Sequence, residues 1–315
     1  MSGPGIVLAF DPQIQLYTPI VQGFFQGAVY GLIGLGIVLL YKSNGIFNFA
    51  QAEFGTVAAL VTYGCLNGSF GGQHMPYAVA ALLGVVAGTL SAVLTERLVV
   101  RPLFNRPKVI LLVGTVGVLL LMVAIEGLAF QNLRNLPAFN AKSKGTFADP
   151  AFDVGFAAYR VSWQEVLILV VLLILALGSV AFFRYSQTGT AILAVSQEPT
   201  AAAVVGISVS RISLITWTIA GFLGSVGGLL LSPGGGLIGP GTVTATALIA
   251  GFTAAVLGGI TSLPGAFVGG VLIGILQRLA GATITQFPGS EQVTVGLVLL
   301  VVLLIRPQGL LGKEA

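Results

Sequence analysis

Charged residues are scarce in this chain of 315 residues, and their scarcity excludes most soluble folds. Asp, Glu, Lys and Arg make up 8% of the residues, hydrophobic residues make up 56%, and the mean hydropathy is +1.00. Soluble domains carry about 25% charged residues. A soluble fold of this composition would expose large apolar patches to water. The composition therefore predicts an integral membrane protein.

Cysteine and histidine are almost missing as well. Cys65 and His74 each stand alone, which excludes an internal disulfide and a Cys/His metal cluster. The sequence contains no Walker-type glycine-rich loop, so we do not expect this chain to bind ATP itself. The segment Gly224–Gly227 lacks the spacing of a nucleophile elbow. We therefore expect no enzymatic activity, no metal site and no cofactor in this chain.

Long apolar runs are abundant, and polar or glycine- and proline-rich stretches separate them. About 20 apolar residues suffice to cross a bilayer as a helix, and several of the runs are shorter than that. The pattern predicts an all-α integral membrane protein, a polytopic bundle of about eight or nine transmembrane segments with short or broken helices. The apolar runs cover residues 19–41, 48–66, 76–100, 109–130, 161–183, 212–231, 242–260, 264–283 and 291–305.

The basic residues set an expected orientation. Residues 97–108 form the densest basic cluster, and cytoplasmic loops of membrane proteins carry an excess of Lys and Arg. Placing this cluster in the cytoplasm makes the N-terminus external and the C-terminus cytoplasmic. Residues 131–160 then form an extracytoplasmic loop with a short helix or hairpin, and residues 184–211 form a cytoplasmic loop. Scattered in this way, the basic residues indicate topology rather than a nucleic-acid surface.

Residues 184–211 are neither a span nor a simple linker. We expect one short helix over 190–197 and a second over 201–205, because Pro199 disfavours helix at the residue before it. Thr200 is the expected N-cap of the second helix, and Gly206 is its expected stop. The composition leaves two readings open, an ordinary inter-helix loop and a contact surface for a partner outside the membrane.

Charges inside apolar segments are costly and mark candidate functional positions. We expect Glu126 and Arg278 to lie at a similar depth near the external interface and to pair with each other. Such a pair holds helices together more often than it binds a substrate. Glu53 lies close to Asn48 and Gln51, and this polar cluster either caps a helix or lines a translocation path.

Glycine and proline mark two further features of the apolar segments. Gly23, Gly27 and Gly31 recur every fourth residue, which predicts one helix face that approaches a neighbouring helix closely. Ser262 and Pro264 interrupt the apolar run between residues 242 and 283. This break is either part of the translocation path, where irregular backbone is tolerated, or a tight cytoplasmic turn.

Three stretches of the chain resemble the LivH/LivM family, the membrane permease subunits of ATP-binding-cassette importers for branched-chain amino acids. Residues 45–54, GIFNFAQAEF, are similar to the family's INFAHGEF-type segment, with Gln51 in place of a common His. Residues 252–270 form the most specific match, and with residues 306–310 the resemblance covers most of residues 20–311. The third stretch resembles the family's cytoplasmic loop through Gly189, Ala191, Ala194, Glu198, Ala202, Gly206 and Ile207, although Thr190 and Leu193 stand where basic residues are common.

The resemblance implies that residues 1–315 are a single permease domain in a bacterial inner membrane, which passes leucine, isoleucine or valine from an extracytoplasmic binding protein. Residues 184–211 would then be the loop that couples to the ATPase. The implied partners are two ATPase subunits, which hold the ATP and Mg²⁺, a second, related permease subunit in a heterodimer rather than a homodimer, and membrane lipid, with no nucleic acid. Two alternatives stay open: a permease of the same family for urea, amides or another small organic solute, and a stand-alone channel or secondary transporter.

Overall fold

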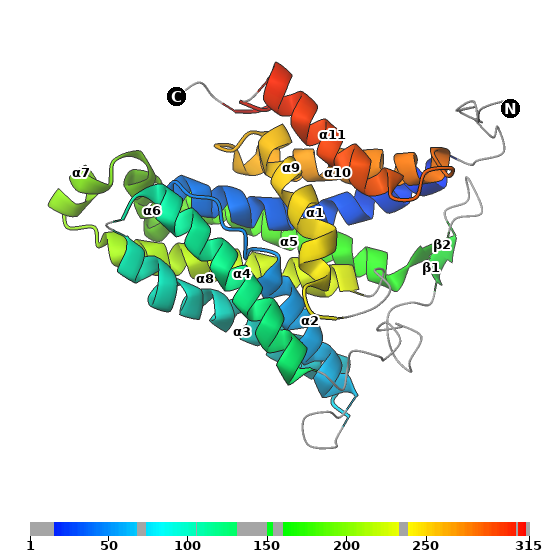
Figure 1. The fold of residues 1–315 in the computed structure, drawn as a ribbon, viewed down its shortest axis with the longest axis horizontal. Helices are drawn as coiled ribbons and strands as arrows, with labels where there is room; N and C mark the ends of the chain where they lie inside the picture. Colours follow the sequence, from blue (N-terminus) through cyan, green and yellow to red (C-terminus); the bar gives the residue numbers. More distant parts are fainter. Residues whose placement is uncertain are drawn as a thin grey trace, which may run out of the picture.

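The structure is a computed structural model, which describes residues 16–67, 74–104, 106–130, 150–153, 160–232, 239–306 and 308–312. Within these ranges six helices are long and apolar enough to cross a membrane (Figure 1). They are α1 (Tyr17–Asn44), α3 (Tyr77–Thr95), α4 (Lys108–Ala129), α5 (Trp163–Tyr185), α8 (Val209–Leu231) and α10 (Leu263–Thr283). A π-helical turn, η1 (Glu96–Val100), and a 3-10 turn, η2 (Arg101–Leu103), extend α3.

The remaining described elements are shorter. Three apolar helices pack among the long ones: α2 (Glu53–Leu66), α9 (Ile249–Gly258) with the π-helical turn η5 (Thr244–Leu248) before it, and α11 (Ser290–Ile305). Two further helices, α6 (Gln187–Gln197) and α7 (Pro199–Val204), follow α5. The strands β1 (Pro150–Asp153) and β2 (Arg160–Ser162) form an antiparallel pair. The predicted all-α bundle with short and broken helices is thereby confirmed; the rest of the predicted loop over residues 131–160 lies outside the described residues.

Helix α1 lies at the centre of the bundle, in contact with α5, α8, α9 and α10. Its glycine face packs directly on the backbone of α10, as the fourfold spacing predicts. A Cβ atom added to Gly27 would lie 2.5 Å from the carbonyl oxygen of Gly270, and one added to Gly23 would lie 2.6 Å from the Cα of Ile275. Side chains larger than hydrogen therefore have no room at these positions, and the glycines permit the close approach of the two helices.

The helices at the periphery turn apolar side chains outward. Leu82 of α3, Leu128 of α4, Leu177 of α5 and Leu304 of α11 are all exposed. In a soluble protein such faces would be an aggregation hazard, whereas in a bilayer they suit contact with lipid. The exposure pattern thus agrees with the composition.

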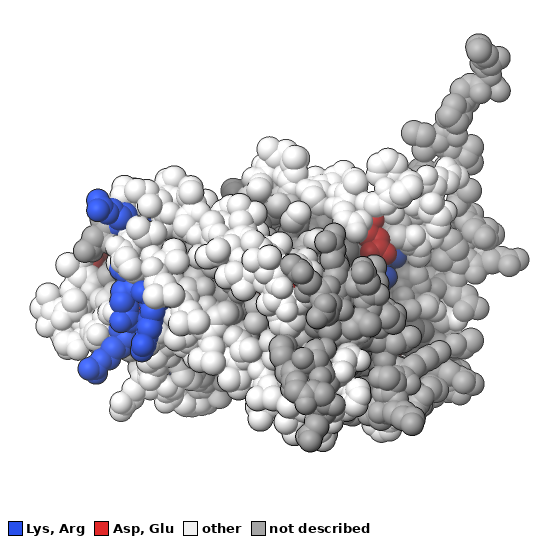
Figure 2. Space-filling model, turned by 60° about the horizontal axis from the view of Figure 1, so that its bottom comes forward, with Lys and Arg blue, Asp and Glu red and all other residues white. Residues whose placement is uncertain are grey.

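The bundle has two chemically different ends. Figure 2 shows Lys and Arg side chains gathered at the end of the visible face where α6 and α7 lie in Figure 1. We call this the basic end; Arg97, Arg106, Lys108, Arg184 and Arg211 are exposed beside the helix termini there. The opposite end, which holds the starts of α1, α5 and α11, is called the hairpin end because β1 and β2 adjoin it.

Candidate functional site: an anchored helix pair and two cavities

Local capping explains why the chain after α5 folds into two short helices. Ser186 accepts hydrogen bonds from the backbone N–H groups of Thr188 and Gly189 and so begins α6. Helix α6 ends where Glu198 becomes extended, and Pro199 occupies the first turn of α7, a position that proline favours. The N-cap of α7 is Glu198 and not Thr200. The prediction of Thr200 was wrong because the Glu198 carboxylate accepts hydrogen bonds from the backbone N–H and the hydroxyl of that residue.

The predicted stop at Gly206 is confirmed by its left-handed backbone, with φ of +90°. The N–H of Ile207 donates to the carbonyl of Ala202, and the N–H of Gly206 donates to the carbonyl of Ala203, each at 3.0 Å. These two bonds satisfy carbonyl groups that the end of a helix leaves open. Helices α6 and α7 are therefore closed at both outer boundaries and form one compact unit.

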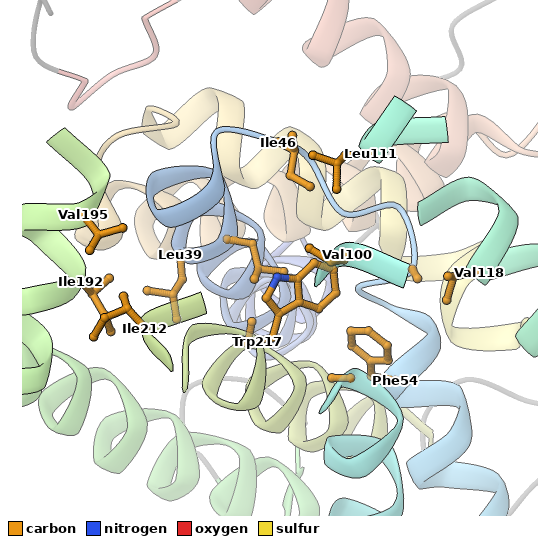
Figure 3. Packing of buried hydrophobic residues seen from close by; sticks show 14 of the residues in the cluster. Leu39, Ile46, Phe54, Val100, Leu111, Val118, Ile192, Val195, Ile212 and Trp217 are labelled. Atoms are coloured by element: carbon orange, nitrogen blue, oxygen red, sulfur yellow. The ribbon is translucent and has the colours of Figure 1, made fainter. Parts of the chain in front are cut away.

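One face of the helix pair is fixed to the membrane bundle. Ile192 and Val195 of α6 are buried in a cluster with Leu39 of α1 and Ile212 of α8 (Figure 3). Complete burial of such a side chain is worth roughly 1.5–3 kcal/mol. A Cβ on Gly189 would clash with the backbone of α5, 2.9 Å from the Cα of Phe183. The unit thus moves with α1, α5 and α8 rather than swinging as a free loop.

The other face of the helix pair is exposed and partly apolar. Val204 and Val205 are 85% and 75% exposed, and both lie at the basic end, outside the apolar runs. Glu198 is also exposed, and hydrogen bonds from Thr200 hold the pKa of its carboxyl below the usual value. The two valines could not be singled out from the sequence, where residues 201–205 indicate only a short helix. Their exposure beside charged residues is the signal that points to a contact surface.

The loop residues chosen from sequence divide between these two faces. Gly189 and Ala202 are buried and hold the helix pair to the bundle, while Ala191 and Ala194 are half-buried. Glu198 and Gly206 lie on the exposed side. The set therefore contains residues that anchor the unit as well as residues that a partner can reach.

Two cavities lie between α5 and α10, one toward each end of α1. The cavity at the hairpin end measures about 570 Å³ and is lined by polar and charged residues that include Gln26, Arg278 and Glu291. The cavity at the basic end measures about 470 Å³ and is almost wholly apolar, with Leu35, Phe267 and Pro264 among its lining residues. Residues of α1, α5 and α10 contribute to the lining of both cavities.

An apolar layer separates the two cavities. Leu32 and Leu35 of α1 pack with Leu172 of α5 in one buried cluster, and Phe267 of α10 packs against that cluster. These side chains fill the space between the two cavities along α1. A shift of α5 relative to α10 would be needed to join the cavities, because these two helices line both.

The polar cluster near the start of α2 holds the backbone of a broken segment. Asn48 donates to the side-chain oxygen of Gln51 at 3.3 Å and accepts from the N–H of Ala50 at 3.0 Å. Gln51 in turn donates to the carbonyl of Ala220 in α8 at 2.7 Å. These groups are fully buried, and they satisfy backbone groups that would be costly in the membrane. Neither side chain caps α2, because its N-cap residue, Ala52, receives no side-chain hydrogen bond. The capping alternative for Asn48 and Gln51 was therefore wrong, and their contacts instead tie the broken segment to α8.

Glu126 and Arg278 do not pair, so that prediction was wrong. The Glu126 carboxylate accepts from the N–H of Gly241 at 3.1 Å and contacts the carboxyl group of Glu53, which also accepts from the hydroxyl of Thr244. Arg278 lies instead 3.5 Å from Glu291 at the hairpin end. Glu126 and Arg278 stand on helices that occupy different sides of the bundle, which counting residues along each helix cannot reveal.

The break between α9 and α10 is a tight turn. Ser262 caps α10 by accepting from the N–H of Gly265 at 3.1 Å, and Gly259 adopts a left-handed φ of +106°. The chain after α11 returns to this turn, where Leu310 donates to the carbonyl of Leu257. Ser262 thus has a capping role, whereas Pro264 lines the apolar cavity.

A polytopic bundle of apolar helices with a cavity toward each end is typical of a membrane permease. Comparison with known proteins gives the family. A sequence profile described as "Branched-chain amino acid transport system / permease component" matches residues 20–305, so the chain belongs to that family.

Two curated relatives illustrate the match. The chain is 30% identical, over 96% of its own length and 98% of the relative's, to the high-affinity branched-chain amino acid transport system permease protein BraD of Pseudomonas aeruginosa. It is 29% identical, over 93% of its length and 94% of the relative's, to the protein of the same description, LivH, of Escherichia coli K12. The resemblance found from the sequence is thereby confirmed.

Proposed function

We propose that this chain is the permease subunit of an ATP-driven importer and forms part of the path for leucine, isoleucine and valine. The family supports the permease role and the substrate class. The observation that carries the mechanism is the helix pair α6–α7, which is buried on one face against three spanning helices and exposes two valines on the other. This arrangement suits a device that passes motion from a partner at the membrane surface into the bundle.

In this proposal α6 and α7 dock on an ATPase subunit. The exposed side chains of Val204 and Val205 fit an apolar groove of the partner, because burial of an apolar side chain stabilises the contact by roughly 1.5–3 kcal/mol. Closure of the ATPase dimer then moves the helix pair, and with it α5, since Gly189 packs on the α5 backbone. Nucleotide must bind one conformation of the importer better than the other for this step to do work.

The proposed path runs along α1 between α5 and α10. A solute enters the polar cavity, passes the apolar layer when α5 shifts, and leaves through the apolar cavity near Pro264. Apolar side chains of the substrate match the apolar lining beyond the first cavity. A second, related permease subunit would cover the open side of this path. An extracytoplasmic binding protein would deliver the substrate to the hairpin end.

The orientation belongs to the proposal as well. The basic end faces the cytoplasm because Lys and Arg gather there, which puts α6 and α7 within reach of an ATPase and makes the C-terminal tail cytoplasmic. The chain is then a multi-pass protein of the inner membrane.

The test of docking is a pair of charge substitutions on α7. We expect Val204→Glu with Val205→Glu to abolish co-purification of the ATPase and leucine uptake, because a groove that accepts two valines would have to bury two carboxylates. The matched control is Ile284→Glu with Phe287→Glu, which places the same two charges on exposed apolar residues of the hairpin end and should leave co-purification unchanged. Normal co-purification of the double variant would contradict docking through α7.

A further inference from the structure

The cavity at the hairpin end combines the chemical groups that a branched-chain amino acid requires of a binding site. Its volume of about 570 Å³ falls within the roughly 300–1,000 Å³ usual for small-molecule pockets. A cation of α10 and an anion of α11 face it, a second carboxylate, Glu165, caps the start of α5 at its edge, and amide and apolar side chains complete the lining. These residues are Arg278, Glu291, Gln26, Gln277, Val29 and Ile168.

The charged pair in this cavity is loosely held. Arg278 and Glu291 meet through one contact of 3.5 Å, and their side chains are 35% and 31% exposed. Exposed ion pairs contribute only about 0–1 kcal/mol, and this partly exposed pair has a single long contact. A ligand that brings its own carboxylate and ammonium groups can therefore replace the contact at little cost.

The Arg278 guanidinium is also held in a fixed place with donors to spare. Its Nε donates to the side-chain oxygen of Gln26, whose amide nitrogen donates to the buried hydroxyl of Tyr30. Among the described residues, Gln26 engages Nε, and Glu291 engages Nη1 only at 3.5 Å, so a ligand that displaces Glu291 can use Nη1 and Nη2 together. Arg binds carboxylates through such a fork of parallel N–H groups.

A buried acceptor in the same cavity supplies an independent indication of a ligand. Gln277 is 5% exposed and lines the cavity, yet its side-chain oxygen has no hydrogen-bond partner among the residues that the structure describes. A buried amide oxygen without a partner costs about 1–3 kcal/mol. An ammonium group in the cavity would satisfy this oxygen and would lie beside Glu291 at the same time.

We propose that this cavity binds the α-amino acid as a zwitterion before it enters the apolar path. Arg278 binds the carboxylate, Glu291 and the oxygen of Gln277 bind the ammonium group, and the aliphatic side chain lies against Val29 and Ile168. The inference rests on the proposed function, which supplies the substrate class. It assigns to the permease itself a selectivity for the two charges of an amino acid, in addition to any selection by a binding protein.

The same pair also joins α10 to α11, and the test must separate the two roles. Glu291 packs over Gly281, where an added Cβ would lie 2.5 Å from the carboxylate oxygen. If the pair only tethered α10 to α11, removal of either charge would weaken the binding of every ligand equally. A binding site would instead lose affinity only for ligands that carry the matching charge.

The experiment measures binding of radiolabelled L-leucine to the assembled importer in nanodiscs without binding protein. Competitors are leucinamide, which lacks the carboxylate, and 4-methylpentanoate, which lacks the ammonium group. We expect Arg278→Gln to lower the affinity for leucine and for 4-methylpentanoate by about tenfold or more, because a charge-assisted hydrogen bond is lost. The affinity for leucinamide should stay unchanged. Glu291→Gln should lower the affinity for leucine and for leucinamide and leave the affinity for 4-methylpentanoate unchanged.

The control is Arg101→Gln, because Arg101 forms a comparable ion pair with Glu96, at 3.2 Å, and does not line this cavity. This variant should keep the wild-type ratios among the three ligands. Equal weakening of all three ligands by Arg278→Gln and Glu291→Gln, or no leucine binding to the wild-type complex, would overturn the inference. Leucine uptake by the wild-type importer, measured in parallel with binding protein, tests the proposed function separately. If uptake is normal but the variants weaken the binding of all three ligands equally, the inference fails and the proposed function stands.

Discussion

Replacement of Gly27 by leucine tests the central packing contact of the bundle. A Cβ atom at this position would lie 2.5 Å from the carbonyl oxygen of Gly270 and 2.8 Å from the Cα of Val271. Carbon atoms in ordinary contact lie about 3.5–4.0 Å apart, so α1 and α10 would have to separate by roughly 1 Å for the first added atom alone. Both obstacles are backbone atoms, which cannot rotate away as a side chain can.

We expect this separation to lower the free energy of unfolding by about 1–3 kcal/mol, the usual cost of overpacking a well-packed interior. The leucine side chain should put the loss at the upper end of that range. The assay is the fraction of monodisperse protein after heating in detergent, together with leucine uptake in membranes, for Gly27→Leu and for the control Gly117→Leu in α4, whose added Cβ would meet nothing within 4 Å.

The control should retain wild-type stability and uptake. Wild-type stability of Gly27→Leu would mean that α1 and α10 are further apart than described. An equal loss in both variants would mean that leucine disturbs membrane insertion rather than this contact.

Three further predictions concern topology, capping and a buried carboxylate. A reporter fused after Gln187 should report the cytoplasm and one fused after Gly289 the exterior; the same side for both would refute the orientation. Glu198→Ala should speed amide exchange in α7 near neutral pH, because the hydrogen bonds that lower the pKa of the Glu198 carboxyl stabilise the cap above its unfolded pKa and are lost as the pH falls through the lowered value. The difference in exchange rate from wild type should vanish in acid. A difference that does not depend on pH would contradict this role. Glu126→Leu should destabilise the protein by about 1–3 kcal/mol, since it leaves the N–H of Gly241 without its partner; unchanged thermal stability would show that this bond is dispensable.

The helices and their ends were largely predictable from the sequence because local chemistry decides them. Run length identified the spans, Pro199 fixed the boundary between α6 and α7, and the glycine at 206 closed α7. The N-cap of α7 was misassigned because Thr and Glu both accept backbone hydrogen bonds, and only the folded geometry shows which carboxylate or hydroxyl reaches the N–H. The repeated glycines predicted a close helix contact but could not name α10 as the partner.

The candidate site was less predictable because it depends on the order of helices around the bundle. The polar cavity is lined by residues as distant in sequence as Gln22, Ser162 and Gln292, and no local pattern brings them together. The false pairing of Glu126 with Arg278 has the same cause, since depth along a helix can be counted whereas its neighbours cannot. Exposed apolar residues at a water-facing end, such as Val204, became visible only once burial was known.

ATP-driven uptake of labelled L-leucine into proteoliposomes tests the central claim most directly. The vesicles would hold this chain with its ATPase and permease partners, with binding protein outside the vesicles and ATP inside. The account predicts accumulation against a leucine gradient that requires ATP and is lost with Val204→Glu and Val205→Glu. Accumulation without ATP, driven by a gradient of protons or Na⁺, would contradict it, because the buried Glu53 and Glu126 carboxyl groups would then be the coupling site of a secondary transporter.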